Sequence, residues 1–272
     1  MFKIFDKIIA EWQIASNYYQ NMIVKENGIA ETINSTDIDT RCTSKIKAIV
    51  SDVLFQQTFS NCQIELKQVE IEKLVAPQRL VNLDYVEKLI EKLPETPKSE
   101  DLIDFCLNPQ QMPPAPKIQQ VAQNMVSCSS ISPQFRFLGG FPKQLIKEDI
   151  LASHAGGLPV AAFILLIGYG SPVCNVLSVN DRMILNNGFH RMYALGKIGI
   201  KHAPVVIQKI TAPDLEFPPN VAGLPKEYLL NHKRPVIMRD FFDSKLVKII
   251  HKKPTITGLQ LSWNFNQAPV PI

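Results

Sequence analysis

The chain has 272 residues, of which 46% are hydrophobic and 20% are charged. This is the composition of a globular protein, and the length is enough for one large domain or two smaller ones. The longest apolar run, Leu158 to Ile167, has about half of the roughly 20 residues that a membrane-spanning helix needs. The first residues show no signal-peptide pattern. We therefore expect a cytoplasmic protein with no membrane partner.

The net charge of +4 is spread unevenly along the chain. Residues 1–136 hold 14 Lys and Arg against 17 Asp and Glu, whereas residues 137–272 hold 15 against 8. The basic second half favours phosphates or other anions as ligands, but it is too mildly charged to favour nucleic acid. The five cysteines include no Cys-x-x-Cys pair, so the sequence indicates no zinc site and predicts reduced thiols.

Hydrophobic periodicity predicts several helices and one strand in the first half of the chain. The strand covers residues 64–71, where the apolar alternation slips by one residue between Leu66 and Val69 and so predicts a bulge. Asn82 is the expected N-cap of the next helix. We expect helices over residues 2–24, 45–59, 83–93, 99–107 and 117–126, and a polar loop over residues 26–43.

The middle of the chain is punctuated by proline and glycine. The prolines at positions 113, 114 and 116 exclude a regular helix or a central strand over residues 108–117, so this stretch is a predicted linker. We expect a loop at residues 127–130, a turn at Gly139-Gly140, and a buried strand at residues 160–167.

The second half is predicted to be rich in strands. Residues 173–179 and 182–185 can form a hairpin, because Asn180 and Asp181 between them tolerate positive φ. A turn at residues 186–188 then leads into a short helix, Phe189 to Lys197, and Gly199 precedes a strand at residues 205–207. From about residue 211 the chain is a proline-rich, irregular tail.

The turn Asn186-Asn187-Gly188 and the helix start after it form a candidate anion site. A helix start leaves backbone N–H groups without partners, and the helix dipole favours negative charge there. Arg191 in the first turn can donate two parallel hydrogen bonds to phosphate oxygens. Gly188 would let a phosphate approach where a Cβ would block it.

These residues resemble the core motif of the ParB/sulfiredoxin-like superfamily. The family pattern Gly-x-x-Arg-x-x-Ala is present as Gly188, Arg191 and Ala194, and residues 199–205 fit the exit into the next strand. Residues 69–93 resemble the opening strand of the family, a loop with Arg79, and the first helix. The resemblance covers about a quarter of the chain.

The resemblance implies an α/β (α+β) fold with a ParB/sulfiredoxin-like core at residues 63–210, interrupted by a long insertion at about 94–157. Residues 1–62 would be a helical extension and residues 211–272 a C-terminal extension that packs on the core. It also implies a nucleotide ligand, ATP or CTP, with Mg²⁺ as a companion ion. The residues that would bind its phosphates are Asn187, Gly188, Phe189, His190, Arg191 and Arg79.

Three departures from the family restrict the expected chemistry. Phe189 stands where sulfiredoxins have their nucleophilic cysteine, so Cys-dependent sulfinic-acid reduction is not expected. Asn187 replaces the Asp of the free-serine kinases and has no charge to bind Mg²⁺ or accept a proton. No helix-turn-helix domain of the kind that reads DNA is evident after the motif.

The leading hypothesis is a nucleotide-dependent enzyme that acts on a small molecule by phosphoryl transfer or hydrolysis, an ATP- or CTP-dependent phosphotransferase or hydrolase. The alternatives are a non-catalytic nucleotide- or nucleic-acid-binding module, or a partner-binding protein that has lost catalysis. His190 and Asn187 are the catalytic candidates. His190 would contact phosphate or fill the edge of the core, and the two asparagines of the turn would alternatively satisfy positive φ.

Further polar residues are weaker candidates. Acidic side chains near the two matched segments could act as a general base, although each is more typical of a solvated charge. His154, beside Gly156-Gly157, could line a loop. The acidic candidates are Glu70, Glu72, Asp84, Glu87 and Asp181.

Overall fold

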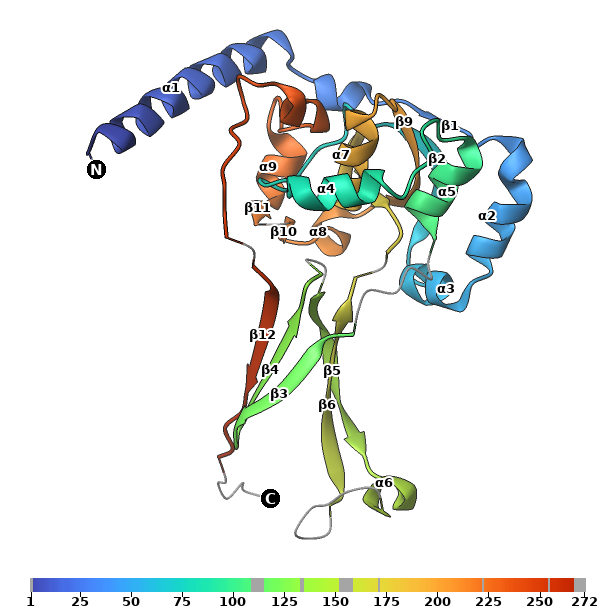
Figure 1. The fold of residues 1–272 in the computed structure, drawn as a ribbon. Coiled ribbons are helices and arrows are strands. Elements are labelled where there is room, and N and C mark those ends of the chain that lie inside the picture. Colours follow the sequence, from blue (N-terminus) through green and yellow to red (C-terminus); the bar gives the residue numbers. More distant parts are fainter. Residues whose placement is uncertain are drawn as a thin grey trace. The chain divides into compact units, whose positions relative to one another are not determined.

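The computed structural model describes residues 2–108, 115–132, 135–151, 159–170, 172–221, 223–253 and 255–266 (Figure 1). The protein has an α/β fold, as predicted. It divides into two compact units. The first unit contains residues 1–111 and 171–250, and the second contains residues 112–170 and 251–272. The predicted N-terminal extension therefore belongs to the same unit as most of the predicted core. Residues 251–272 belong to the same unit as most of the predicted insertion.

The helices of the first unit largely match the predicted periodicity. The expected helix over residues 45–59 is instead two helices. Asp52 accepts hydrogen bonds from the N–H groups of Leu54 and Phe55 and so caps a new helix start. Asn82 accepts the N–H of Tyr85 at 3.1 Å and caps its helix as predicted. The helices are α1 (Phe2–Lys25), α2 (Thr43–Val50), α3 (Val53–Phe59), α4 (Leu83–Ile90), α5 (Ser99–Leu107), α7 (Phe189–Lys197), α8 (Pro213–Glu216) and α9 (Lys226–Asn231), with 3-10 turns η1 (Ile29–Thr32), η2 (Thr40–Cys42) and η3 (Met238–Phe242).

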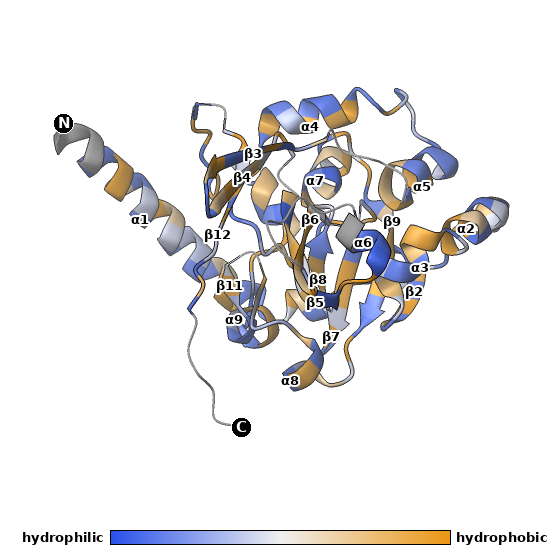
Figure 2. Ribbon diagram, turned by 90° about the horizontal axis from the view of Figure 1, so that it is seen from below, coloured by the Kyte–Doolittle hydropathy of each residue, from blue (hydrophilic) through white to orange (hydrophobic). Residues whose placement is uncertain are grey.

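The coloured part of α1 carries both hydrophobic and hydrophilic residues (Figure 2). Its C-terminal part packs on the first unit, where the hydroxyl of Tyr19 donates to the carbonyl oxygen of Arg234 at 2.7 Å. The guanidinium of Arg234 lies 5.2 Å from the centre of the Tyr19 ring. Trp12, nearer the N-terminus, is 68% exposed.

Five strands form the sheet of the first unit, in the order β1-β2-β9-β7-β8. β7 and β9 are parallel, and the other neighbours are antiparallel. β2 pairs with β9 residue by residue without a shift of register, so the predicted bulge near Leu66 is wrong. The strands are β1 (Ser35–Thr36), β2 (Gln63–Glu70), β7 (Asn175–Val179), β8 (Arg182–Asn187) and β9 (His202–Lys209).

Both faces of this sheet are covered. Ile184 and Leu185 are neighbours on β8 and therefore point to opposite faces. Both are at most 2% exposed, and they belong to different hydrophobic clusters. The larger cluster packs α4, α5 and α7 against the sheet, and the smaller one includes Leu229 and Leu230 of α9. The candidate turn after β8 is thus held in a packed core.

The second unit is built of antiparallel strands, in sheets of three and two strands. The three-stranded sheet has the order β12-β4-β3, and a residue shift interrupts β3 between Gln120 and Ala122. Among the strands that the structure describes, β5 and β6 pair with each other and with no third strand. The elements are β3 (Lys117–Ala122), β4 (Met125–Ser130), β5 (Phe135–Gln144), α6 (Lys147–Leu151), β6 (Ala161–Tyr169) and β12 (Thr257–Ser262). Two very short strands of the first unit, β10 (Asn220–Val221) and β11 (Leu224–Pro225), also pair with each other.

Several predictions for this unit are wrong. The expected helix over residues 117–126 and loop over residues 127–130 are the strands β3 and β4. Apolar residues at helical spacing occur there, but the pairing of β4 with the distant β12 decides the structure. Gly139-Gly140 lies within β5, next to a shift of register, and Gly139 has a φ of 146°. The strand expected over residues 160–167 is confirmed as β6, but it is not buried, since Phe163 is 79% exposed.

Candidate functional site

The predicted strand–turn–helix–strand motif is confirmed. β8 ends at Asn187, Gly188 has a φ of 100°, and α7 follows at once. Gly199, with a φ of 83°, lies between α7 and β9. The hairpin before the motif is also confirmed, because Asn180 and Asp181 have φ values of 50° and 60°. Local backbone chemistry therefore determines this part of the fold.

Gly188 is needed for two reasons. Its φ lies in the left-handed region, which other residues rarely adopt. A Cβ on Gly188 would also lie 2.4 Å from the Sγ of Cys174 and 3.0 Å from its Cβ. The sequence predicted that a phosphate would approach Gly188 closely. In the structure, the side chain of Cys174 occupies that space.

His190 is part of the packing of α4 against α7. Its Nε2 accepts a hydrogen bond from the backbone N–H of Asn82 at 3.1 Å. Its ring meets the rings of Tyr85 and Phe189 edge to face, with centroids 5.4 and 5.7 Å away. Burial lowers the pKa of His190 to about 4, so the imidazole is neutral at pH 7. These contacts agree with one of the two predicted roles of His190, which is to fill the edge of the core.

Arg191 is buried, with 6% of its surface exposed. Its Nη1 donates to the carbonyl oxygens of Phe105 and Cys106, at 3.2 and 3.3 Å, at the C-terminal end of α5. Its Nη2 is buried without a hydrogen-bond partner. Among the residues that the structure describes, no carboxylate pairs with this guanidinium.

The two other buried arginines differ from Arg191 in this respect. Arg234 donates to both carboxylate oxygens of Asp240, at 2.8 and 2.6 Å, and to Glu26 at 2.9 Å. Arg182 donates from its Nε to Glu31 at 2.7 Å. Buried charges in proteins are normally paired, because an uncompensated charge in the interior is costly. Within the part of the chain that the structure describes, Arg191 is therefore a buried cation without a carboxylate partner.

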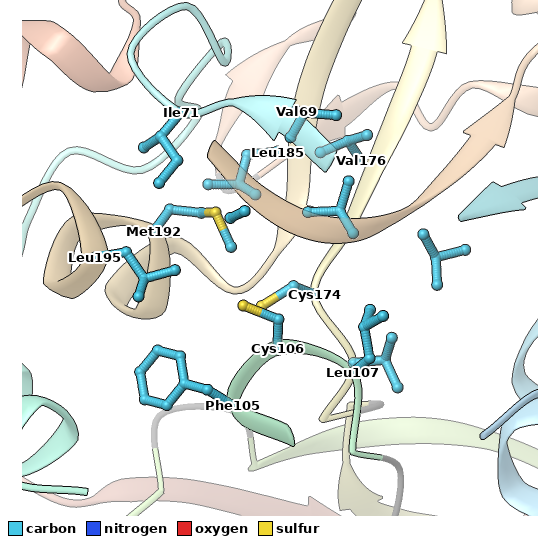
Figure 3. Close-up of a cluster of buried hydrophobic side chains, with 14 of the residues drawn as sticks. Val69, Ile71, Phe105, Cys106, Leu107, Cys174, Val176, Leu185, Met192 and Leu195 are labelled. Atoms are coloured by element: carbon cyan, nitrogen blue, oxygen red, sulfur yellow. The ribbon is translucent and has the colours of Figure 1, made fainter. Parts of the chain in front are cut away.

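Two thiols lie beside Arg191. Cys106 and Cys174 are fully buried, and their sulfur atoms face each other in the core (Figure 3). The N–H of Cys174 donates to the carbonyl oxygen of Cys106 at 2.7 Å. Burial raises the pKa of Cys106. Burial also acts to raise the pKa of Cys174, but the hydrogen bond with Cys106 and the charge of Arg191 outweigh it and lower that pKa.

Sequence reasoning missed this pair. The two cysteines are far apart in the chain and belong to no recognisable motif, so only the contact between α5 and the start of β7 brings them together. A Cys174 thiolate could serve as a weak counter-ion for Arg191. A thiol that stays protonated would leave the guanidinium uncompensated.

The two asparagines of the motif are extended strand residues, so the alternative that they satisfy positive φ is wrong. Asn186 donates from Nδ2 to the Oδ1 of the buried Asn175 at 2.8 Å, and Gln208 donates to the same oxygen at 3.3 Å. Asn187 donates from Nδ2 to the carbonyl oxygen of Val173 at 2.9 Å. These hydrogen bonds fix the amide groups where β7, β8 and β9 meet.

Asn186 also lines an open cavity of about 400 Å³ on the first unit. Carboxamide side chains dominate its polar lining, together with Lys209, which pairs with Glu65 at 2.6 Å. The lining residues are Asn61, Cys62, Gln63, Leu177, Asn186, Gln208, Lys209, Ile210, Thr211, Glu216 and Pro218. This volume lies within the range of small-molecule sites.

Arg79 lies three residues before Asn82, whose backbone N–H donates to His190 of the motif. It is exposed in the loop between β2 and α4, and it has no ion pair or hydrogen bond within the described ranges. That loop does run beside β8, since the N–H of Leu185 donates to the carbonyl oxygen of Val75 at 2.9 Å. Two of the acidic candidates are paired with lysines, Glu70 with Lys73 and Glu87 with Lys197.

His154 and its neighbouring glycines lie outside the described residues. No cluster of three or more His, Cys, Asp or Glu side chains that could hold a metal ion occurs in the part of the chain that the structure describes. Within the same ranges, no helix is both long and apolar enough to cross a membrane.

Comparison of the chain with protein families, with curated proteins and with solved structures found no significant match. The resemblance to the ParB/sulfiredoxin-like superfamily therefore rests on the motif at residues 187–194 and the segments around it.

Proposed function

We propose that the first unit binds a nucleotide through its phosphates at the start of α7. The observation that carries this proposal is Arg191, a buried guanidinium with one unpartnered nitrogen and no carboxylate partner among the described residues. An anion is the group that would complete its surroundings. Arg182 and Arg234 obtain their anions from within the fold.

The backbone at the start of α7 supports the same ligand. The first hydrogen bond of the helix joins the N–H of Met192 to the carbonyl oxygen of Gly188. The N–H groups of the three preceding residues, 189–191, have no acceptor within the described parts of the chain. Free N–H groups and the positive end of the helix dipole favour a phosphate. Arg191 and the helix start are thus two independent features that favour negative charge.

A nucleotide is proposed rather than a simple phosphate for two reasons. The motif resembles that of nucleotide-binding proteins. The carboxamide-lined cavity also begins at Asn186, two residues before Gly188, and offers donors and acceptors suited to a base or a ribose. Because Arg191 is buried beneath the carbonyl groups of Phe105 and Cys106, binding requires the end of α5 to move.

The proposed activity is phosphoryl transfer or hydrolysis on a small molecule, in which positioning and charge neutralisation would supply the catalysis. One observation favours a non-catalytic binding module instead. Within the described residues, no carboxylate pairs with His190 or Arg191, and His190 is neutral and already hydrogen-bonded. A measurement of turnover must therefore accompany each measurement of binding.

The test is a thermal-shift titration of the whole chain with ATP, CTP, GTP and pyrophosphate, with and without Mg²⁺. At about 100-fold over Kd, binding stabilises the folded state by roughly 2.7 kcal/mol and raises Tm. Arg191→Met should abolish the shift, and Arg41→Met, at an exposed arginine paired with Asp39, should keep it. Phosphate release measured on the same samples separates an enzyme from a binding module.

Two results would contradict the proposal. A folded wild-type protein that shows no shift with any of these ligands does not bind nucleotides. A shift that Arg191→Met retains in full places the ligand elsewhere, and the cavity beside Asn186 would then be the next site to test.

A further inference from the structure

Cys106 and Cys174 are free thiols whose backbones are close enough for a disulfide. The N–H of Cys174 donates to the carbonyl oxygen of Cys106 at 2.7 Å. Standard bond lengths from these two atoms to the Cα atoms then limit the distance between the two Cα atoms to at most about 6.6 Å. The Cα atoms of disulfides usually lie roughly 4.4–6.8 Å apart. Because the two sulfur atoms also face each other in the core (Figure 3), a disulfide can form here with little movement of the backbone.

Cys174 lies where a thiolate is stabilised. Its sulfur packs against Gly188, the N-cap of α7, since a Cβ on that glycine would lie 2.4 Å from the sulfur. A helix N-terminus and a neighbouring arginine both favour the thiolate form of a cysteine. Burial acts to raise the pKa of Cys174, but its hydrogen bond with Cys106 and the charge of Arg191 outweigh burial and lower that pKa. Because the thiolate is the nucleophile in thiol–disulfide exchange, Cys174 is the attacking sulfur of the pair.

Cys42 shows how an ordinary buried cysteine of the same unit differs from this pair. It is buried and belongs to the same hydrophobic cluster as Cys106 and Cys174. Burial and the nearby carboxylate of Asp39 raise the pKa of Cys42, so its thiol stays protonated. A protonated, buried thiol is inert in exchange reactions. The pairing of two thiols beside a cation is therefore what distinguishes Cys106 and Cys174.

A disulfide between these two residues would act on the end of α5. Cys106 lies in the last turn of α5, and Cys174 directly precedes β7. Arg191 donates to the carbonyl oxygens of Phe105 and Cys106, so the end of α5 covers its guanidinium. A covalent link from Cys106 to the start of β7 would hold this cover in place.

We propose that Cys106 and Cys174 form a reversible disulfide, by exchange with a small disulfide, and that this bond fixes the end of α5 over Arg191. The bond keeps the end of α5 from opening, and anion binding to Arg191 requires that opening. Oxidation therefore closes the anion site, and reduction by thiols reopens it. The effect on anion binding rests on the proposed function, whereas the disulfide and its effect on α5 do not.

The exchange has two steps. The Cys174 thiolate attacks one sulfur of the small disulfide, which breaks that bond and releases one small thiolate. Cys106 then loses its proton, and its thiolate attacks the Sγ of Cys174 and releases the second small thiolate. The two cysteines lose two electrons and two protons in total, and the small disulfide takes them up as two thiols. Because both cysteines are buried, the reagent reaches them when the end of α5 opens locally.

The first measurement locates the disulfide in the whole chain after equilibration with reduced or oxidised glutathione. Cys62→Ser serves as the background, because it removes the exposed thiol. The remaining free thiols are alkylated in denaturant, and mass spectrometry of the peptides identifies the bonded pair. We expect a bond between Cys106 and Cys174 in the oxidised sample. Cys174→Ser should lose this bond, and Cys42→Ser, at the matched buried cysteine, should keep it.

Two further measurements on the same reduced and oxidised samples test the effect of the bond. Hydrogen exchange in residues 99–107 should become at least about tenfold slower on oxidation and stay unchanged in α9, on the opposite face of the sheet. Pyrophosphate should raise the Tm of the reduced protein, and its affinity for the oxidised protein should be at least about tenfold weaker.

Three results would overturn this proposal. They are a folded protein that forms no bond between Cys106 and Cys174, a bond that leaves hydrogen exchange in α5 unchanged, and a pyrophosphate shift that is equal in the two samples. If pyrophosphate stabilises neither sample, the proposed nucleotide binding fails. The location of the disulfide and the hydrogen exchange of α5 then still decide whether the pair fixes this helix.

Discussion

Replacement of Arg191 by methionine tests whether this arginine stabilises the fold or instead requires an external anion. In the structure, Arg191 donates two rather long hydrogen bonds to neutral carbonyl oxygens, at 3.2 and 3.3 Å. Hydrogen bonds that involve a charged group contribute about 1.5–3 kcal/mol each in good geometry, so these two together contribute at most about 3 kcal/mol. Burial of an unpaired cation costs several kcal/mol, which offsets that gain.

Arg191→Met should therefore change the free energy of unfolding by less than about 1.5 kcal/mol, since the methionine fills most of the same space. Arg234→Met is the comparison. It leaves Asp240, which is 4% exposed, without its cation, and breaking a buried pair in this way costs about 3–5 kcal/mol. Urea denaturation followed by circular dichroism measures both values under the same conditions.

Equal destabilisation by the two substitutions would refute the reasoning. It would mean that Arg191 is already neutralised within the fold, with the Cys174 thiolate as the nearest candidate, and needs no external anion. In the expected case, pyrophosphate stabilises the wild type and Arg234→Met but has no effect on Arg191→Met.

Two further predictions concern the residues beside Arg191. Gly188→Ala should destabilise the protein by about 2–4 kcal/mol, because it combines a φ of 100° with a Cβ 2.4 Å from the Sγ of Cys174. In thermal denaturation, Gly199→Ala, with positive φ and open space, should cost about 1 kcal/mol, and Gly258→Ala, with open space and no positive φ, should cost close to none. Equal effects of all three substitutions would contradict this account. The pKa of His190 is about 4 in the folded protein against an ordinary value of 6.5, so the unfolded chain takes up the proton first as the pH falls. The free energy of unfolding should be highest above pH 6.5 and should fall by about 3 kcal/mol between pH 6.5 and pH 4. In denaturation curves, His190→Gln should lack that fall. An identical pH profile in the two proteins would show that His190 is not desolvated.

The sequence by itself determined the elements whose conformation is fixed by neighbouring residues. Asn180 and Asp181 adopt the positive φ values that their hairpin requires, and Gly188 and Gly199 delimit α7 as predicted. Asn82 caps α4 through a hydrogen bond that spans three residues. Each of these depends on local sterics and local hydrogen bonds, so a short window of sequence contains the necessary information.

Only the tertiary structure decided which side chains meet. Arg191 faces α5 and the Cys106–Cys174 pair because β7 and α5, which are far apart in the chain, pack together. β3 and β4 are strands because β12 pairs with β4 from the other end of the chain, against a helical spacing of apolar residues. β6 has the sequence of a buried strand, yet its Phe163 is 79% exposed. Long-range pairing and burial depend on the whole fold and on partners, and no local pattern encodes them.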